Sequence, residues 1–359
     1  MLELKPDLEK TIQRMDAFWE RELIDRPVVQ IPLEKPPAEC IPLPASHHTS
    51  SHERWLDVDY QLALVSTELA NREFLGDTIP MAFPNLGPEV FPSFYGCPLH
   101  FGDYGTSWTD PILHDWGSAD QIHMDWDSIY LKKLLALTDA FFQAGKGKWL
   151  TAMPDWHPGG DCLAAFRDPQ NLAIDLLEHP DEVKVLLNRI EADYFQIYDL
   201  FYDKLHAGGL PVTSWTPLVV NGKYYIPSND FSIMISKSQY DEFFLPGIQR
   251  ECQFLDRSIY HLDGPGALRH LDSILDIPEL GAIQFVPGAG NEDFSRWIEV
   301  YRKIQRAGKG IQVNCFFSEL DEVMQALDPH GLFLYISDCP SRELAEKALT
   351  RLEKWCAST

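Results

Sequence analysis

Polar residues that can do chemistry recur at the ends of short apolar runs in this sequence. The run KWLTAMPD ends at Asp155 and is followed by His157, and the run SIYHLD ends in His261 and Asp263. Cys339 follows LFLYIS, the last apolar run of the chain. Imidazole and carboxylate groups are the usual general acids and bases, and together with thiolates they are the usual ligands of zinc. The pattern therefore indicates an enzyme site, with or without a metal.

The tripeptide His261-Leu262-Asp263 is the strongest metal candidate. Residues i and i+2 of a strand point to the same side, so the imidazole and the carboxylate can converge on one point. With Cys339 they form a His/Asp/Cys set, and three protein ligands plus an open position is the arrangement of catalytic zinc. In the alternative interpretation, His261 and Asp263 hydrogen-bond each other and the following Gly-Pro-Gly turn. Cys315 competes for the thiolate role, and a buried, unreactive thiol is the default for either cysteine.

A second set of polar residues lies outside this tripeptide. Asp155 and His157 form either a general acid–base pair or a cap on the Pro-Gly-Gly turn that follows them. Asp161 is a candidate helix cap, and Asp230, in the segment SNDFSIMIS, either faces the site from a loop or caps a helix. Three further residues close other apolar runs and are candidate substrate contacts: Trp215, Gln284 and Asn314.

The elements that must position these residues alternate between strand and helix. Strand candidates occur near residues 28, 79, 148, 210, 258, 282, 310 and 332, with helix-like segments between them from about residue 128 onward. Such alternation predicts an α/β fold with a parallel sheet. Because no G-x-G-x-x-G motif follows the first strand, a closed (β/α)8 TIM barrel is favoured over an open nucleotide-binding sheet. In a barrel, the reacting groups lie at the C-terminal ends of the strands, where these polar residues occur.

The chain is predicted to be one domain over residues 1–359, since no repeat or low-complexity linker divides it. An N-terminal helical extension precedes the barrel, and long loops are inserted into it. Residues 78–127 are crowded with Pro, Gly and aromatic residues, which is typical of a functional loop or a small accessory subdomain.

Composition narrows the functional class. The chain has 359 residues, with 30 Lys+Arg and 54 Asp+Glu, a formal net charge of −24. Such an acidic balance argues against binding to nucleic acid or to an anionic membrane. No apolar run is long enough to span a membrane, and the seven cysteines are scattered without a disulfide pattern. These features predict a soluble, cytoplasmic protein.

The sequence resembles the uroporphyrinogen decarboxylase-like superfamily, which includes the corrinoid:coenzyme M methyltransferases and is related to cobalamin-independent methionine synthase. The resemblance rests on AFWERELIDRPVV, SNDFSIMISKSQYDEFFLPGIQ and IYHLDGPGALRHLDSILDIPELGAIQFVPGAG, and on the region of Cys339. It covers most of the chain, loosely in 35–130 and best in 224–290. The resemblance implies a (β/α)8 barrel.

The resemblance favours the methyltransferase branch. Uroporphyrinogen decarboxylase binds its many carboxylates with N-terminal arginines, whereas residues 27–53 contain none. The methyltransferases hold zinc with a His-x-Cys pair and a second Cys near the C-terminus. His261 and Cys339 match that pattern, but Asp263 stands where the first Cys would fall. Asp is a competent ligand, so the resemblance implies a harder, less thiolate-rich zinc site made by His261, Asp263 and Cys339.

The expected function is thus zinc-dependent methyl transfer from a methyl-corrinoid, or another activated donor, to a metal-activated small-molecule nucleophile. Asp155, His157 and Asp230 would orient the substrate. A separate corrinoid protein would supply the methyl group, because the chain has no obvious cobalamin-binding domain. Members of the superfamily often dimerise, so a homodimer is a further expectation. Two alternatives are a metal-free lyase or decarboxylase that uses acid–base catalysis, and a non-catalytic barrel that binds a corrinoid or small ligand.

Overall fold

The central feature of the molecule is a seven-stranded sheet with the strand order β2-β1-β11-β10-β9-β8-β7. The computed structural model describes residues 2–103 and 105–357. Every neighbouring pair in the sheet is parallel except β1 and β2. Its strands are β1 (Val28–Glu34), β2 (Arg72–Gly76), β7 (Tyr224–Tyr225), β8 (Arg257–Asp263), β9 (Ala282–Val286), β10 (Gly310–Cys315) and β11 (Leu332–Ile336). Two smaller sheets pair β3 (Met81–Ala82) with β6 (Leu150–Thr151) and β4 (Leu99–Phe101) with β5 (Ser107–Thr109).

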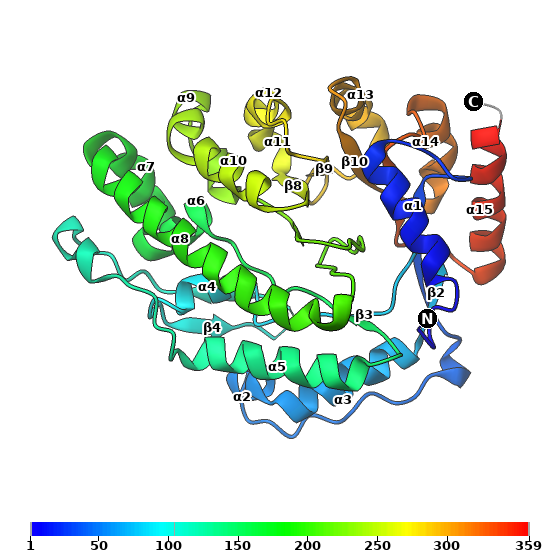
Figure 1. Cartoon of the computed structure of the whole chain (residues 1–359), viewed down its shortest axis with the longest axis horizontal. Coiled ribbons are helices and arrows are strands. Elements are labelled where there is room, and N and C mark those ends of the chain that lie inside the picture. The colour runs from blue at the N-terminus through cyan, green and yellow to red at the C-terminus, as the bar shows by residue number, and fades with distance from the viewer. Residues whose placement is uncertain (1, 104, 358–359) are drawn as a thin grey trace.

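Helices alternate with the strands and cover the sheet from several sides. Figure 1 shows α9 to α14 along one side of the molecule, α2, α3 and α5 along the opposite side, and α15 beside the C-terminus. The longer helices are α1 (Leu8–Glu20), α3 (Val58–Ala70), α5 (Ile129–Gly145), α6 (Gly159–Arg167), α7 (Pro169–Glu178), α8 (Pro180–Leu205), α10 (Leu245–Phe254), α13 (Ile298–Arg306) and α15 (Arg342–Ala357). The shorter ones are α2 (Ser51–Leu56), α4 (Val90–Ser93), α9 (Lys237–Gln239), α11 (Gly264–Ala267), α12 (Leu271–Leu275) and α14 (Leu320–Ala326).

The C-terminal strands explain why the fold class could be predicted. In β9, β10 and β11 nearly every residue is buried, whichever face of the sheet it points to. Continuous apolar runs of this kind belong to parallel strands that are covered on both faces. The predicted α/β fold with a mostly parallel sheet is confirmed.

Most of the strand candidates form strands, but one does not. The candidates near 28, 79, 148, 258, 282, 310 and 332 correspond to β1, β3, β6, β8, β9, β10 and β11. The prediction near residue 210 was wrong, because Val212 makes only an isolated antiparallel bridge to Val220. Pro211 beside this bridge has no N–H to give to a ladder, which limits pairing there.

The aromatic-rich region 78–127 contains β3, α4, β4, β5 and a short 3₁₀ helix, Trp116–Gln121. Its buried side chains, among them Phe91, Phe94 and Phe101, belong to the same hydrophobic cluster as the main strands. Trp108 and Trp126 are instead exposed. Most of the aromatic residues that drew attention in the sequence therefore contribute to the packing of the core.

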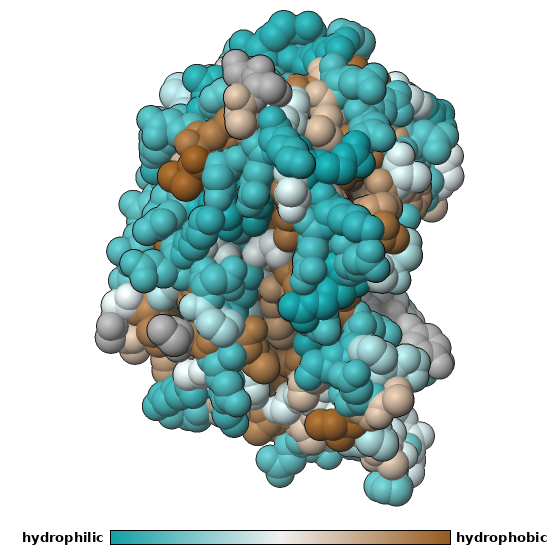
Figure 2. All heavy atoms as spheres, turned by 90° about the vertical axis from the view of Figure 1, so that its right-hand side faces the viewer, coloured by the Kyte–Doolittle hydropathy of each residue, from teal (hydrophilic) through white to brown (hydrophobic). Residues whose placement is uncertain are grey.

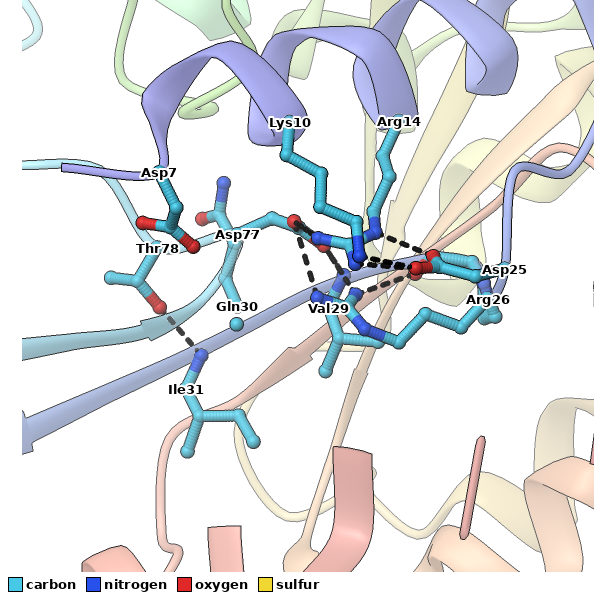
Figure 3. Close-up of polar contacts among 12 residues, drawn as sticks. Asp7, Lys10, Arg14, Asp25, Arg26, Val29, Gln30, Ile31, Asp77 and Thr78 are labelled. Atoms are coloured by element: carbon cyan, nitrogen blue, oxygen red, sulfur yellow. Dashed lines mark hydrogen bonds and ion pairs between the residues drawn. The ribbon is translucent and has the colours of Figure 1, made fainter. Parts of the chain in front are cut away.

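A buried ion-pair cluster ties α1 to the beginning of β1 (Figure 3). Asp77 is fully buried, and its carboxylate pairs with the guanidinium groups of Arg14, at 3.0 Å, and of Arg26. It also accepts a hydrogen bond from the backbone N–H of Val29 at 2.9 Å. Arg14 makes a second, two-pronged contact with Asp25. The buried carboxylate of Asp77 is thus both ion-paired and hydrogen-bonded, as a buried charge requires.

One face of the molecule is largely hydrophilic. The face that carries α15 is covered mainly by hydrophilic residues (Figure 2). Within residues 2–103 and 105–357, no helix combines the length and apolar character needed to cross a membrane.

Candidate functional site

The site begins with two side chains on β8. His261 and Asp263 lie two residues apart on this strand, so they point to the same side, as their spacing predicts. The neighbouring parallel strand β9 places Gln284 directly opposite His261. The Nδ1 atom of His261 lies 2.6 Å from Oε1 of Gln284. Because that amide oxygen can only accept, Nδ1 is the donor in this contact, which leaves Nε2 as the ring atom that could bind a metal ion.

Asp230 completes a group that could hold a metal ion. It opens a short 3₁₀ helix, Asp230–Met234, and the preceding segment pairs with β8 through a parallel bridge between Ser228 and His261. This pairing brings one ligand atom each of Asp230, His261 and Asp263 within 4.8 Å of one another. The Oδ1 atom of Asp230 is buried and has no hydrogen-bond partner. Burial, and then the nearby carboxylate of Asp161, raise the pKa of Asp230 to about 6.

The donor set fits a divalent cation. A buried carboxylate oxygen without a partner is costly unless a proton or a cation satisfies it. A ligating imidazole usually donates its other N–H to a second polar group, and the contact from His261 to Gln284 has this form. Two carboxylates and one imidazole are competent zinc ligands, and three protein ligands leave a position open. They are harder ligands than thiolates, which agrees with the harder, less thiolate-rich site that the resemblance implies.

Cys339, the third ligand expected from the sequence, is not a member of this group. Its thiol donates a weak hydrogen bond to the carbonyl of Ser341 at 3.5 Å, and burial raises its pKa. Burial also raises the pKa of Cys315 to about 12. Both cysteines therefore resist ionisation, while Asp230, expected only to orient substrate, lies beside His261 and Asp263.

A second titratable cluster adjoins the first. His157 lies with Nε2 at 3.2 Å from Asp155 Oδ1 and with Nδ1 at 3.7 Å from Asp161 Oδ2 and 3.0 Å from Ser228 Oγ. Burial opposes the charge on this imidazole, but the two carboxylates prevail and raise its pKa well above the ordinary value. Asp155 and His157 are therefore in contact, and their action as a general acid–base pair stays a prediction.

Asp161 joins the two clusters, and the sequence argument missed this role. Its carboxylate accepts hydrogen bonds from the backbone N–H groups of Asp230, at 3.1 Å, and Phe231, at 2.8 Å. It therefore holds the beginning of the 3₁₀ helix in place next to His157. His157 lies two residues before α6 and Asp161 lies in the first turn of that helix, so their closeness in the sequence was the available signal.

Two cavities meet this site. One, of about 470 Å³, is lined by Asp230, His157 and Asp161, among other residues. The other, of about 260 Å³, is lined by Trp215, Gln284 and Asn314, the three candidate substrate contacts. The ring of Trp215 also packs edge-on against the imidazole of His261, with centroids 5.2 Å apart. The metal-competent group thus lines the first cavity through Asp230, and it is linked to the second only through Trp215 and Gln284, which contact His261.

Comparisons with known proteins concern the fold. No protein-family model matches this sequence, and no curated protein matches it. Among solved structures, a methyltransferase from Methanosarcina mazei has a similar fold, with a TM-score of 0.62 and 9% sequence identity. The similarity covers 97% of this chain and 99% of that one. The chain thus shares its overall fold with a methyltransferase.

Proposed function

We propose that the chain is a zinc-dependent methyltransferase with a uroporphyrinogen decarboxylase-like barrel. It would move a methyl group between a methyl-corrinoid, or another activated donor, and a metal-activated small-molecule nucleophile. The observation that carries the proposal is the group of Asp230, His261 and Asp263, with its unpartnered carboxylate oxygen and its oriented imidazole. The similar fold of a methyltransferase supports the reaction class.

Closure of the strands into a barrel belongs to the proposal. Support comes from backbone hydrogen bonds that continue beyond the small β3–β6 sheet. The N–H of Ala152 donates to the carbonyl of Ala82, and the N–H of Met153 donates to the carbonyl of Thr213. These bonds lead from β3 through β6 toward the bridge at Val212. A barrel closed in this way would gather the C-terminal strand ends around one mouth.

The residues of the chain have distinct parts in this reaction. A zinc ion bound by Asp230, His261 and Asp263 would lower the pKa of a thiol or water in the open position. Gln284 keeps the proton of His261 on Nδ1, so Nε2 remains available as a ligand. His157, kept positively charged by Asp155 and Asp161, would hold or donate a proton beside the reacting groups.

The two cavities suit a reaction between two molecules. Their volumes, about 470 Å³ and 260 Å³, are those of small-molecule sites. We assign the larger cavity to a small activated methyl donor and the smaller one to the acceptor. A corrinoid carried by a separate protein would present its methyl group at the open mouth instead of entering a cavity of this size.

A metal-free lyase or decarboxylase is the second candidate, and the His157 cluster favours it. A buried imidazolium between two carboxylates is a competent general acid at neutral pH. In that function Asp155 and Asp161 would sustain the charge of His157, and Asp263 would act as a second acid–base group.

Metal content and methyl transfer together test the proposal. The purified protein, after incubation with zinc and removal of the excess, is expected to retain about one zinc per chain, as three ligands and an open position require. Zinc-loaded protein should then demethylate methylcobalamin in the presence of a thiol, and the change in cobalamin absorbance would record it. A chain that retains no zinc would contradict the metal mechanism and leave the acid–base alternative.

Gln284→Leu is expected to weaken zinc binding about 10- to 100-fold, because the imidazole of His261 loses the acceptor that sets its tautomer. Gln312→Leu is the matched control. Gln312 lies opposite Gln284 on β10 and hydrogen-bonds Asn314 at 3.2 Å, so its loss should leave the zinc affinity unchanged. Competition with a chromophoric chelator measures both. Equal losses in the two variants would contradict the role given to Gln284.

A further inference from the structure

The larger cavity is lined by more groups that can carry negative charge than positive charge. Four carboxylates line it, those of Glu89, Asp161, Asp168 and Asp230. Among the described residues that line it, none is a lysine or arginine, and His157 is the one group that can carry positive charge. If Asp230 binds the metal, three carboxylates still face one imidazolium.

Neutral donors hold these three carboxylates in place. Glu89 accepts from the N–H of Thr109 at 2.5 Å and from its hydroxyl at 2.7 Å. Asp168 caps α7 by accepting from the N–H groups of Gln170, at 2.9 Å, and Asn171, at 3.3 Å. Asp161 likewise accepts from two backbone N–H groups. The carboxylates are therefore fixed without ion pairs to Lys or Arg, and their field extends into the cavity.

The remaining walls of the cavity are apolar. Ile233 and Met234 line it and are 48% and 46% exposed, which is unusual for large apolar side chains. The other apolar lining residues include Pro88, Pro92, Pro111, Ala164 and Ala165. A ligand that suits both features has a positive charge and an apolar surface.

We infer that this cavity binds a methylated onium ion, a quaternary ammonium or a sulfonium, as the methyl donor. The inference rests on the proposed methyl transfer and concerns its small activated donor, the alternative to a methyl-corrinoid presented at the mouth. An onium ion presents methyl groups to the apolar walls and its charge to the carboxylates. An anionic donor would meet like charges, which is unfavourable at short range.

The chemistry of transfer suits such a donor. The electron pair of the nucleophile forms a bond to the methyl carbon, the C–N or C–S bond breaks, and its electron pair stays on nitrogen or sulfur. The leaving group is then a neutral amine or sulfide, which needs no proton to depart. Having lost the charge that the carboxylates attract, the product is held less tightly than the donor.

Calorimetry on the full-length protein with matched probes tests the inference. Choline and 3,3-dimethylbutan-1-ol have the same shape, but only choline is charged. Choline is expected to bind at least about tenfold more tightly at low salt, and less tightly as salt rises. The anion 3,3-dimethylbutanoate should not bind. Equal affinity for choline and the neutral alcohol would overturn the inference.

Variants that remove one charge keep the contacts of the carboxylates. In Glu89→Gln and Asp168→Asn, an amide oxygen can still accept the existing hydrogen bonds, and Asn is also a good helix cap. Each change is expected to weaken choline binding about fivefold and to leave the alcohol unaffected. Glu178→Gln, on the exposed end of α7, is the control and should change neither. No effect of the two cavity variants would overturn the inference.

Two further probes separate the onium classes. Tetramethylammonium and trimethylsulfonium differ in the central atom. If either ion binds more tightly than the neutral alcohol, the inference is supported. Binding of neither overturns it. Zinc content, measured on the same samples, distinguishes failure of the zinc mechanism from failure of the onium inference. A chain without zinc contradicts the zinc mechanism, but the carboxylates of Glu89 and Asp168 remain and can still bind choline.

Discussion

His261→Ala and Asp230→Ala are each expected to reduce bound zinc from about one equivalent per chain to near zero. Each removes one of three direct ligands, so the loss should exceed the roughly 10- to 100-fold that follows from changing an outer-shell partner. Methyl transfer should fall with the zinc, since the nucleophile loses the ion that lowers its pKa. Elemental analysis after incubation with zinc and removal of the excess measures the first effect.

Cys339→Ser is the control that separates two ligand sets. The group formed by Asp230, His261 and Asp263 predicts that this variant keeps its zinc. The set expected from the sequence, with Cys339 as third ligand, predicts that it loses zinc while Asp230→Ala keeps it. The second outcome would contradict the site proposed here. Circular dichroism of each variant would show that the fold is retained.

Asp77→Ala is expected to destabilise the protein by about 3–5 kcal/mol, the usual consequence of removing one partner from a buried ion pair. Arg14 and Arg26 are 5% and 4% exposed, so both guanidinium groups would remain buried with too few acceptors. The N–H of Val29 would also lose its partner at the beginning of β1. A lower midpoint of urea denaturation measures the effect.

An exposed ion pair provides the comparison for Asp77. Glu343 and Lys347, one turn apart on α15, are 77% and 62% exposed at the side chain, and such pairs contribute about 0–1 kcal/mol. Glu343→Gln should therefore leave the midpoint of denaturation almost unchanged. Similar midpoints for Asp77→Ala and Glu343→Gln would show that the cluster in Figure 3 does not stabilise the fold.

Much of the fold could be predicted because its signals are local. The apolar runs of β9, β10 and β11 and the helices between them follow from residue periodicity alone, without knowledge of distant contacts. The strand predicted near residue 210 does not form, because strand pairing depends on the backbone of a neighbouring segment as well as on the strand's own sequence. The same dependence limits β3 and β6 to two residues each. The edge strand β2 was not among the strand candidates, and it forms by antiparallel pairing with β1, some 40 residues earlier.

For the site, too, local spacing predicted one part and only the tertiary structure decided the rest. The spacing of His261 and Asp263 determined that they share one side of a strand, because alternation is a property of every extended chain. The tertiary structure alone decided that Gln284 orients His261, that Asp161 holds the segment of Asp230, and that Asp230, instead of Cys339, lies beside His261 and Asp263. Those contacts join residues 23 to 69 positions apart, and they depend on which strands and loops become neighbours when the core packs. Residue types and local periodicity therefore determine which chemistry the chain can do, whereas the packing of distant segments selects the residues that do it.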